Sequence, residues 1–329
     1  MHSYLYGRDG FVWFTGVVED RNDPERLGRV RVRIFSYHTK NKTDIPTEDP
    51  QWSHIIYPVT TPSMDGMGHT PSFLVEGSQV FGFFRDPDAF QEPMILGSIP
   101  GVASTKSKPS EGFNDPNGKY PKKTNEPDTN RLAANNPQKR HQVLNSKEND
   151  LTENVSSADG TSWSEPSSTY NASYPKNHVF ESESGHIVEF DDTPNSERIH
   201  EYHKSGTFYE VDAEGNKVTR VVGDNYEIVA GNDYVNIKGN ANIHVNGDCN
   251  ISSDGNMKFK AGNAALQPSV LGDDLSDVIK EIVSILSSLD VIVPGAPPGT
   301  VGPGASVKLA KLKVLLNRKP FLSKTIENN

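Results

Sequence analysis

The stretch that decides the fold runs from residue 215 to residue 259: GNKVTRVV GDNYEIVA GNDYVNIK GNANIHVN GDCNISSD GNMKF. A glycine opens every block of eight residues, and Asn or Asp follows each glycine. The glycines are Gly215, Gly223, Gly231, Gly239, Gly247 and Gly255. A fixed period of this kind indicates one structural unit that the chain uses repeatedly.

Each block, or octad, combines the pattern of a strand with the pattern of a turn. The fourth and sixth residues after the glycine tend to be apolar and the fifth polar, as in Val235-Asn236-Ile237 and Ile243-His244-Val245. This alternation predicts a short strand with one buried face. Gly followed by Asn or Asp predicts a tight turn, since these residues tolerate a positive φ. An octad is therefore expected to form one strand and one corner. Positions in an octad are counted from the residue after its glycine, so Val235 is a fourth residue and Ile237 a sixth residue.

One strand and one corner cannot close a coil, and an isolated ribbon would leave its edges and apolar face open. Three copies of the chain would solve this by each supplying one side of a triangular prism. We therefore expect an intertwined homotrimer, with the octads forming a triple-stranded β-helix. A series of ordinary hairpins is the alternative, but equal spacings disfavour it. The predicted axial core consists of Val221, Val229, Val235, Ile237, Ile243, Val245, Ile251 and Phe259.

Composition limits the possible partners. The chain has 329 residues, 34% hydrophobic residues and a formal net charge of −10. This content is lean for one large core but suits a small domain joined to fibrous parts. The acidic balance disfavours nucleic acid and anionic lipid as partners, because both need a basic face. Cys249 is the one cysteine, so no disulfide within the chain is expected, and we interpret it as an inert thiol.

The expected organisation has five parts: 1–100, a small β-barrel; 101–177, an extended polar linker; 178–212, a β neck; 213–263, the octads; and 264–329, a tail with short amphipathic helices. In the barrel, Arg29, Arg31 and Arg33 alternate along one strand. They could bind phosphates, but the acidity of the chain favours a solvated or interface face. The linker is too polar to bury its own core, so we expect it to wrap a partner or to stay mobile.

The tail contains a helical pattern. Leu275, Ile279, Ile282, Leu286 and Leu289 follow one another at intervals of 4, 3, 4 and 3 residues. This spacing is the a/d seam of a short coiled coil. Two arrangements remain open: the helices of three chains bundle together, or each amphipathic helix lies on its own chain.

No residue pattern predicts a catalytic site, a metal site or a cofactor. His200 and His203 are expected on opposite faces of a strand, and His244 is expected to face outward. Asp191 and Asp192 precede Thr-Pro, so turn capping is the preferred interpretation of this acidic pair. We find neither a nucleophile elbow nor a phosphate-binding loop.

Three further segments carry a resemblance to a known family. Residues 28–33 are GRVRVR, residues 91–97 are QEPMILG and residues 184–192 are SGHIVEFDD. Their order resembles the OB-fold and neck of phage tail spikes and VgrG proteins, and the octads resemble the triple-stranded β-helix of T-even-type central spikes. The resemblance implies an all-β chain: an N-terminal OB-fold barrel, a polar linker, an intertwined trimeric β-helix and a short helical tail.

The resemblance also implies a function. The chain is expected to be a non-enzymatic component of a phage baseplate hub, made in the host cytoplasm and carried in the virion tail. Its trimeric spike would pierce the host outer envelope when the sheath contracts. Its expected partners are a separate hub ring protein, contacted through the OB-fold, and a PAAR-like tip protein.

The T-even pattern places a lysozyme domain where this chain has its polar linker. The linker is too short and too polar for such a core, so the peptidoglycan-cleaving activity is not carried over. The alternatives are a VgrG-like spike of a contractile secretion system, a tail lysozyme homologue with residual activity, and a host-binding fibre.

Overall fold

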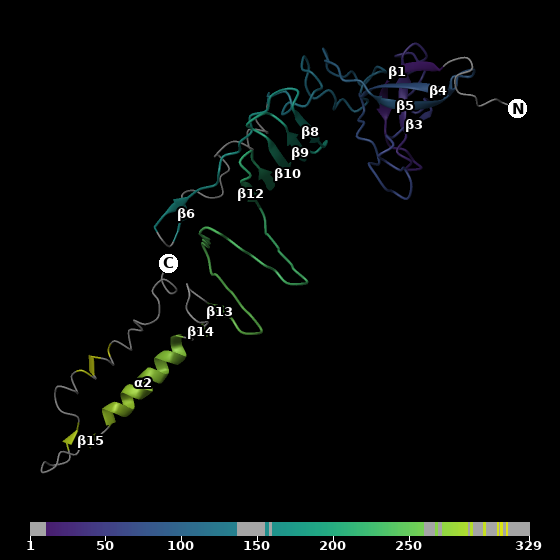
Figure 1. The fold of residues 1–329 in the computed structure, drawn as a ribbon. Coiled ribbons are helices and arrows are strands. Elements are labelled where there is room, and N and C mark those ends of the chain that lie inside the picture. The colour runs from purple at the N-terminus through teal and green to yellow at the C-terminus, as the bar shows by residue number, and fades with distance from the viewer. Residues whose placement is uncertain are drawn as a thin grey trace. The chain divides into compact units, whose positions relative to one another are not determined.

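The computed structural model describes residues 11–136, 155–157, 160–259, 267–268, 272–288, 290–291, 299–300, 308, 310–311 and 314. The chain divides into two compact units, residues 1–244 and residues 245–329. Among the described residues the fold is nearly all β, with one helix in the second unit (Figure 1). This confirms the expected all-β class with a helical tail.

The first unit begins with a closed five-stranded barrel. Its strands are β1 (Val12–Asp20), β2 (Val30–Ile34), β3 (Trp52–Ile55), β4 (Gln79–Asp86) and β5 (Gln91–Ser98), in the spatial order β1-β2-β3-β5-β4. The β3–β5 pair is parallel. Alternate residues point inward and form the core: Phe14, Val18, Val30, Val32, Ile34, Val80, Phe84 and Ile95. The barrel confirms the small β domain that the alternating sequence predicts.

The turn between β1 and β2 is organised by Asp23. The Asp23 carboxylate accepts hydrogen bonds from the backbone N–H of Leu27, at 2.9 Å, and from the Arg29 guanidinium, at 2.7 Å. The hydrogen bond from Arg29 holds the pKa of Asp23 well below its usual range. Gly28 completes the turn at a φ of 75°, a conformation that glycine adopts without steric cost.

The three alternating arginines differ in their surroundings, with Arg31 and Arg33 on β2 and Arg29 directly before it. The Arg33 side chain is fully buried, and its Nε donates to Glu19 Oε1 at 2.7 Å. The Arg31 guanidinium stacks over the Trp52 ring at 4.5 Å, and Arg29 pairs with Asp23. The expectation of a solvated or interface face is therefore wrong for Arg33, because Glu19 supplies a partner for its charge inside the protein.

The described part of the linker makes contacts with its own chain. The Phe113 N–H donates to Glu19 Oε1 at 2.7 Å, and the Phe113 ring stacks on Phe35 with centroids 4.4 Å apart. Farther along, Leu132 is fully buried. These few anchors, spaced far apart in sequence, dock into sites that the barrel and the neck provide, while residues 137–154 and 158–159 of the predicted linker lie outside the described residues.

A close contact in the barrel supports a test of its packing. A Cβ added at Gly82 would collide with the Met94 carbonyl oxygen and lie 2.8 Å from Phe14 Cζ. Overpacking of a core typically costs about 1–3 kcal/mol, so Gly82→Ala should lower the free energy of unfolding by that amount in chemical denaturation. Gly97→Ala is the matched control, because nothing lies within 4 Å of a Cβ there. Equal losses in both variants would contradict this packing.

The neck is a five-stranded antiparallel sheet in the order β12-β11-β10-β9-β8. Its strands are β8 (Asn177–Glu181), β9 (Ile187–Asp191), β10 (Arg198–Tyr202), β11 (Phe208–Val211) and β12 (Lys217–Arg220). Strands β9, β10 and β11 lie within the neck predicted at residues 178–212, and β8 begins one residue before it. The sequence interpretation assigned β12 to the first octad, whereas Lys217–Arg220 pairs with β11. A two-stranded ladder, β6 (Val155–Ser156) with β7 (Ser162–Trp163), completes the strands of this unit.

The second unit contains two short ladders and a helix. Strand β13 (Lys258–Phe259) pairs with β14 (Gln267–Pro268), and β15 (Asp290–Val291) pairs with β16 (Gly299–Thr300). Helix α2 spans Gly272–Ser288 and confirms the helix expected from the heptad spacing. Within the described part of the chain, no helix is long and apolar enough to cross a lipid bilayer.

Candidate functional site

The octads form a ribbon with regular corners, which we call the octad ribbon and define as residues 222–257. The backbone bends at the residue before each glycine and at the glycine itself: at 222–223, 230–231, 238–239, 246–247 and 254–255. Figure 1 shows this part in green as straight runs joined by sharp corners. The predicted corner every eight residues is confirmed.

The conformation of the corners differs from the prediction. Gly215 has a positive φ of 82°, but the five later octad glycines lie outside the left-handed region. A Cβ added at any of these five would meet nothing within 4 Å. The prediction of positive φ is wrong for these corners because a simple bend turns the chain. Within one chain, neither backbone conformation nor crowding explains why glycine recurs there.

The predicted axial residues lie open to solvent. Val235, Ile243 and Ile251, the fourth residues of their octads, are 73–87% exposed, and the sixth residues Val229, Ile237 and Val245 are 47–54% exposed. Val221 is half-buried. Phe259 lies in β13, and its side chain is outside the described residues. Monomeric proteins rarely expose a contiguous apolar row of this length.

The octad ribbon is not part of a described sheet. Among the described residues, no strand pairing involves residues 222–257, although the Val222 N–H donates to Thr207 Oγ1 at 3.1 Å and the Gly255 N–H to Ser253 Oγ at 3.2 Å. A run of chain without strand pairing presents an edge that can pair with other chains. Cys249, on the same ribbon, is a free and exposed thiol.

Beside this ribbon in sequence, the neck sheet buries a network of charges. Arg198 bridges two carboxylates, Glu189 and Glu210, at 2.7 Å each. Glu189 also lies 2.9 Å from His200 Nδ1 and accepts a 2.9 Å hydrogen bond from Asn177. Burial raises the pKa of Glu189, but the His200 hydrogen bond and the Arg198 charge outweigh it, so this pKa lies below its ordinary value.

The second half of the linker covers this charged face. Ser168 Oγ donates to Glu210 at 2.7 Å, and the Tyr170 ring lies 5.0 Å from the Arg198 guanidinium. The Tyr170 hydroxyl donates to the Leu132 carbonyl oxygen at 2.7 Å, and burial raises the pKa of Tyr170 to about 12. The linker thus adds hydrogen bonds and a cation–π contact to this face, although the buried Arg198 Nε and Asn177 Oδ1 have no hydrogen-bond partner among the described residues.

The opposite face of the neck sheet carries exposed apolar side chains. Phe190 and Ile199 are neighbours across β9 and β10, and both are exposed. Phe180 on β8 is exposed as well. The sheet therefore buries its charged face under the linker and exposes apolar side chains on its other face. An antiparallel sheet with one solvated face usually does the reverse, since it buries the apolar face and exposes the polar one.

The histidines and the acidic pair lie as the sequence predicts. His200 is buried and His203 is exposed, which fits opposite faces. Asp191 Oδ1 accepts a 2.9 Å hydrogen bond from the Thr193 N–H, so its turn-capping role is confirmed. Within the described residues, no group of three His, Cys, Asp or Glu side chains is arranged to hold a metal ion.

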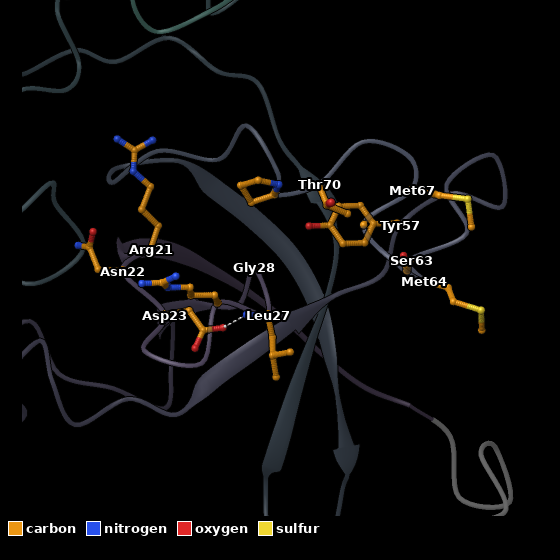
Figure 2. A pocket seen from close by; sticks show the side chains of 13 residues that line it. Arg21, Asn22, Asp23, Leu27, Gly28, Tyr57, Ser63, Met64, Met67 and Thr70 are labelled. Atoms are coloured by element: carbon orange, nitrogen blue, oxygen red, sulfur yellow. Dashed lines mark hydrogen bonds between the residues drawn. The ribbon is translucent and has the colours of Figure 1, made fainter.

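A pocket of about 520 Å³ lies beside the β1–β2 turn. Leu27, Tyr57, Met64 and Met67 contribute apolar lining, as Figure 2 shows. The nearby Asp23 carboxylate is already bound by Arg29 and backbone N–H groups, so it is not available as a general base.

Glu183 supports a pH-dependent prediction. Hydrogen bonds from Lys119 and from Arg21 lower its pKa from 4.5 to about 2. Because the folded pKa is depressed, Glu183 stabilises the fold above about pH 4.5, and this contribution is lost as the pH falls toward 2. Glu183→Gln should therefore cost up to about 1 kcal/mol at pH 7, as surface ion pairs do, and this deficit should vanish near pH 2.

Thermal unfolding of wild type and variant across this pH range measures the effect. Glu201→Gln is the control, since Glu201 is an exposed residue on β10. A deficit for Glu183→Gln that is independent of pH would contradict the assignment.

Comparison with known proteins identifies the family. A family model described as "Gp5 N-terminal OB domain" matches residues 36–201, half of the chain. The chain belongs to this family. It is 42% identical over 255 residues to Protein Gp5 of Vibrio phage KVP40, an alignment that covers 68% of this chain and 60% of that protein. It is also 42% identical over 125 residues to the pre-baseplate central spike protein Gp5 of Enterobacteria phage T4. That second alignment covers 36% of this chain and 21% of the T4 protein.

Proposed function

We propose that this chain is a structural component of a phage tail baseplate and that three copies of its octad ribbon form the central spike. The observation that carries the proposal is the row of exposed apolar side chains that recurs along the octad ribbon, a segment in which no strand pairing is described. The similarity to a protein called pre-baseplate central spike protein supports the location in the virion tail.

Three wound ribbons would satisfy both requirements at once. The apolar fourth and sixth residues of each octad would meet on the axis, and the open backbone groups would pair between chains. Close approach of three chains at each corner would also explain the recurring glycine, which crowding within one chain does not explain.

The mechanical consequence is stiffness. A prism whose strands are all paired has no free edge, and opening it locally would break contacts among three chains together. Such an element could transmit the force of sheath contraction to the host outer envelope. In this proposal the barrel binds a separate hub ring protein and the far end of the spike binds a small tip protein.

The mass of the purified full chain in solution tests the proposal. Sedimentation equilibrium at concentrations where the protein is folded should give three times the chain mass of 36.2 kDa. A folded monomer would refute the spike. We further propose that the chain has no lysozyme activity, and clearing of peptidoglycan in a zymogram would contradict that part alone.

A further inference from the structure

Helix α2 leaves an apolar row open. Leu275, Ile282 and Leu286, three members of the predicted seam, are 39–50% exposed, and the neighbouring Val278 is 54% exposed. Ile279 is half-buried, and Leu289 lies outside the described residues. Along a helix these residues lie one above another on one side, so the open row is continuous.

The contacts of the helix with its own chain reach only one edge of the seam, where Ile279 is half-buried one turn before Val283. Val283 is 1% exposed, which shows that one stripe of α2 is already covered within the chain. Val283 directly follows the seam residue Ile282 and therefore lies about 100° around the helix from it. An amphipathic helix lying on its own chain would have buried the seam itself, so that alternative does not account for the open row.

The charge of the helix excludes an anionic lipid surface as the occupant. Residues 272–288 contain four acidic residues and one basic residue, Lys280, and Lys280 is paired with Asp277 at 2.9 Å. Helices that bind lipid headgroups instead carry Lys and Arg on the polar face. The remaining occupant with matching chemistry is another apolar helix face.

We propose that the α2 seam is the docking surface for the α2 helices of two further copies, which together form a short parallel three-helix coiled coil. The inference rests on the proposed function, because the spike supplies the threefold arrangement. In heptad terms Ile279 and Leu286 occupy a positions, and Leu275 and Ile282 occupy d positions. Val278 occupies a g position, where an apolar residue widens the contact beyond a two-helix seam.

The length of α2 explains why the helices need the spike. Seventeen residues span roughly 25 Å, and isolated helices of this length are marginal in water. Chains already joined through their octads would raise the effective concentration of one α2 helix for another into the millimolar range. The coiled coil would then close the trimer at the C-terminal side of the octads.

Disulfide cross-linking of the full chain tests this arrangement. In a Cys249→Ser background, Ile282→Cys places one thiol on the seam and Ser284→Cys places one on the exposed polar side of the same helix. Thiols on the axis come within disulfide distance, so Ile282→Cys should give at least about tenfold more covalent dimer than Ser284→Cys on non-reducing gels. Ile243→Cys reports separately on the octads.

The outcomes separate the two claims. Cross-linking at 243 with equal or no cross-linking at 282 and 284 would overturn the α2 coiled coil and leave the spike intact. Cross-linking at 282 but not at 243 would support the coiled coil, but it would refute the octad spike and the dependence of the coiled coil on it. A folded monomer without cross-links at either position would refute both.

Discussion

Ile237→Asp should abolish the trimer. Ile237 is the sixth residue of its octad and a predicted axial residue, and it is 54% exposed in one chain. In the proposed prism the substitution would bring three carboxylates together on an apolar axis. A buried, unpaired charge costs several kcal/mol, and repulsion among three like charges adds to this cost. Sedimentation equilibrium should therefore show monomers or disordered aggregates where the wild type gives a single trimeric species.

Asn236→Asp is the matched control. Asn236 precedes Ile237, and its side chain is expected on the outer face of the prism. Adding a carboxylate there should leave the trimer intact and change its melting temperature by only a few degrees, as surface substitutions do. Dissociation of both variants, or of neither, would contradict the assignment of the sixth octad position to the axis.

The octads show which part of a fold a repeat can predict. The period of eight predicted the corners, because a bend depends on local sequence and recurs with it. The corner conformation was mispredicted, since glycine permits a positive φ without requiring one, as the later octad glycines show. The axial core stays a prediction, because the groups that would cover Val235 or Ile243 belong to other chains.

The barrel shows what an alternating sequence pattern cannot predict, even within one chain. The pattern at Arg29, Arg31 and Arg33 correctly predicted a strand, but the environment of Arg33 depends on Glu19 and on Phe113, far away in sequence. A Cβ on Gly112 of the linker would collide with the Arg33 guanidinium. Burial of this charge is a tertiary property that no local pattern encodes.

The charge network of the neck was missed for a similar reason. Glu189, Arg198 and His200 lie on the strands that the sequence predicted, and in a strand such residues suggest a solvated face. The pairing across β9 and β10 places His200 opposite Glu189. A strand register drawn from the sequence alone would have revealed this pair, but the linker that covers it contains no recognisable strand pattern.

Arg198→Met should destabilise the neck by about 3–5 kcal/mol, the usual cost of leaving buried charges without a partner. The Arg198 side chain is fully buried, and its loss would leave Glu189 and Glu210 facing each other without the cation between them. Hydrogen exchange of the amides in β9, β10 and β11, at a fixed protein concentration, should report faster opening of the sheet. The linker residues around Ser168 should lose protection with it, because they dock on the same carboxylate.

Arg85→Met provides the comparison, since Arg85 forms an ion pair with Glu92 in which both side chains are well exposed. Exposed pairs contribute about 0–1 kcal/mol, so the two variants should differ by at least a factor of three in their loss of stability. Equal losses would mean that the neck tolerates bare carboxylates through water entry. In that case the buried charge network would not be what holds the linker on the neck sheet.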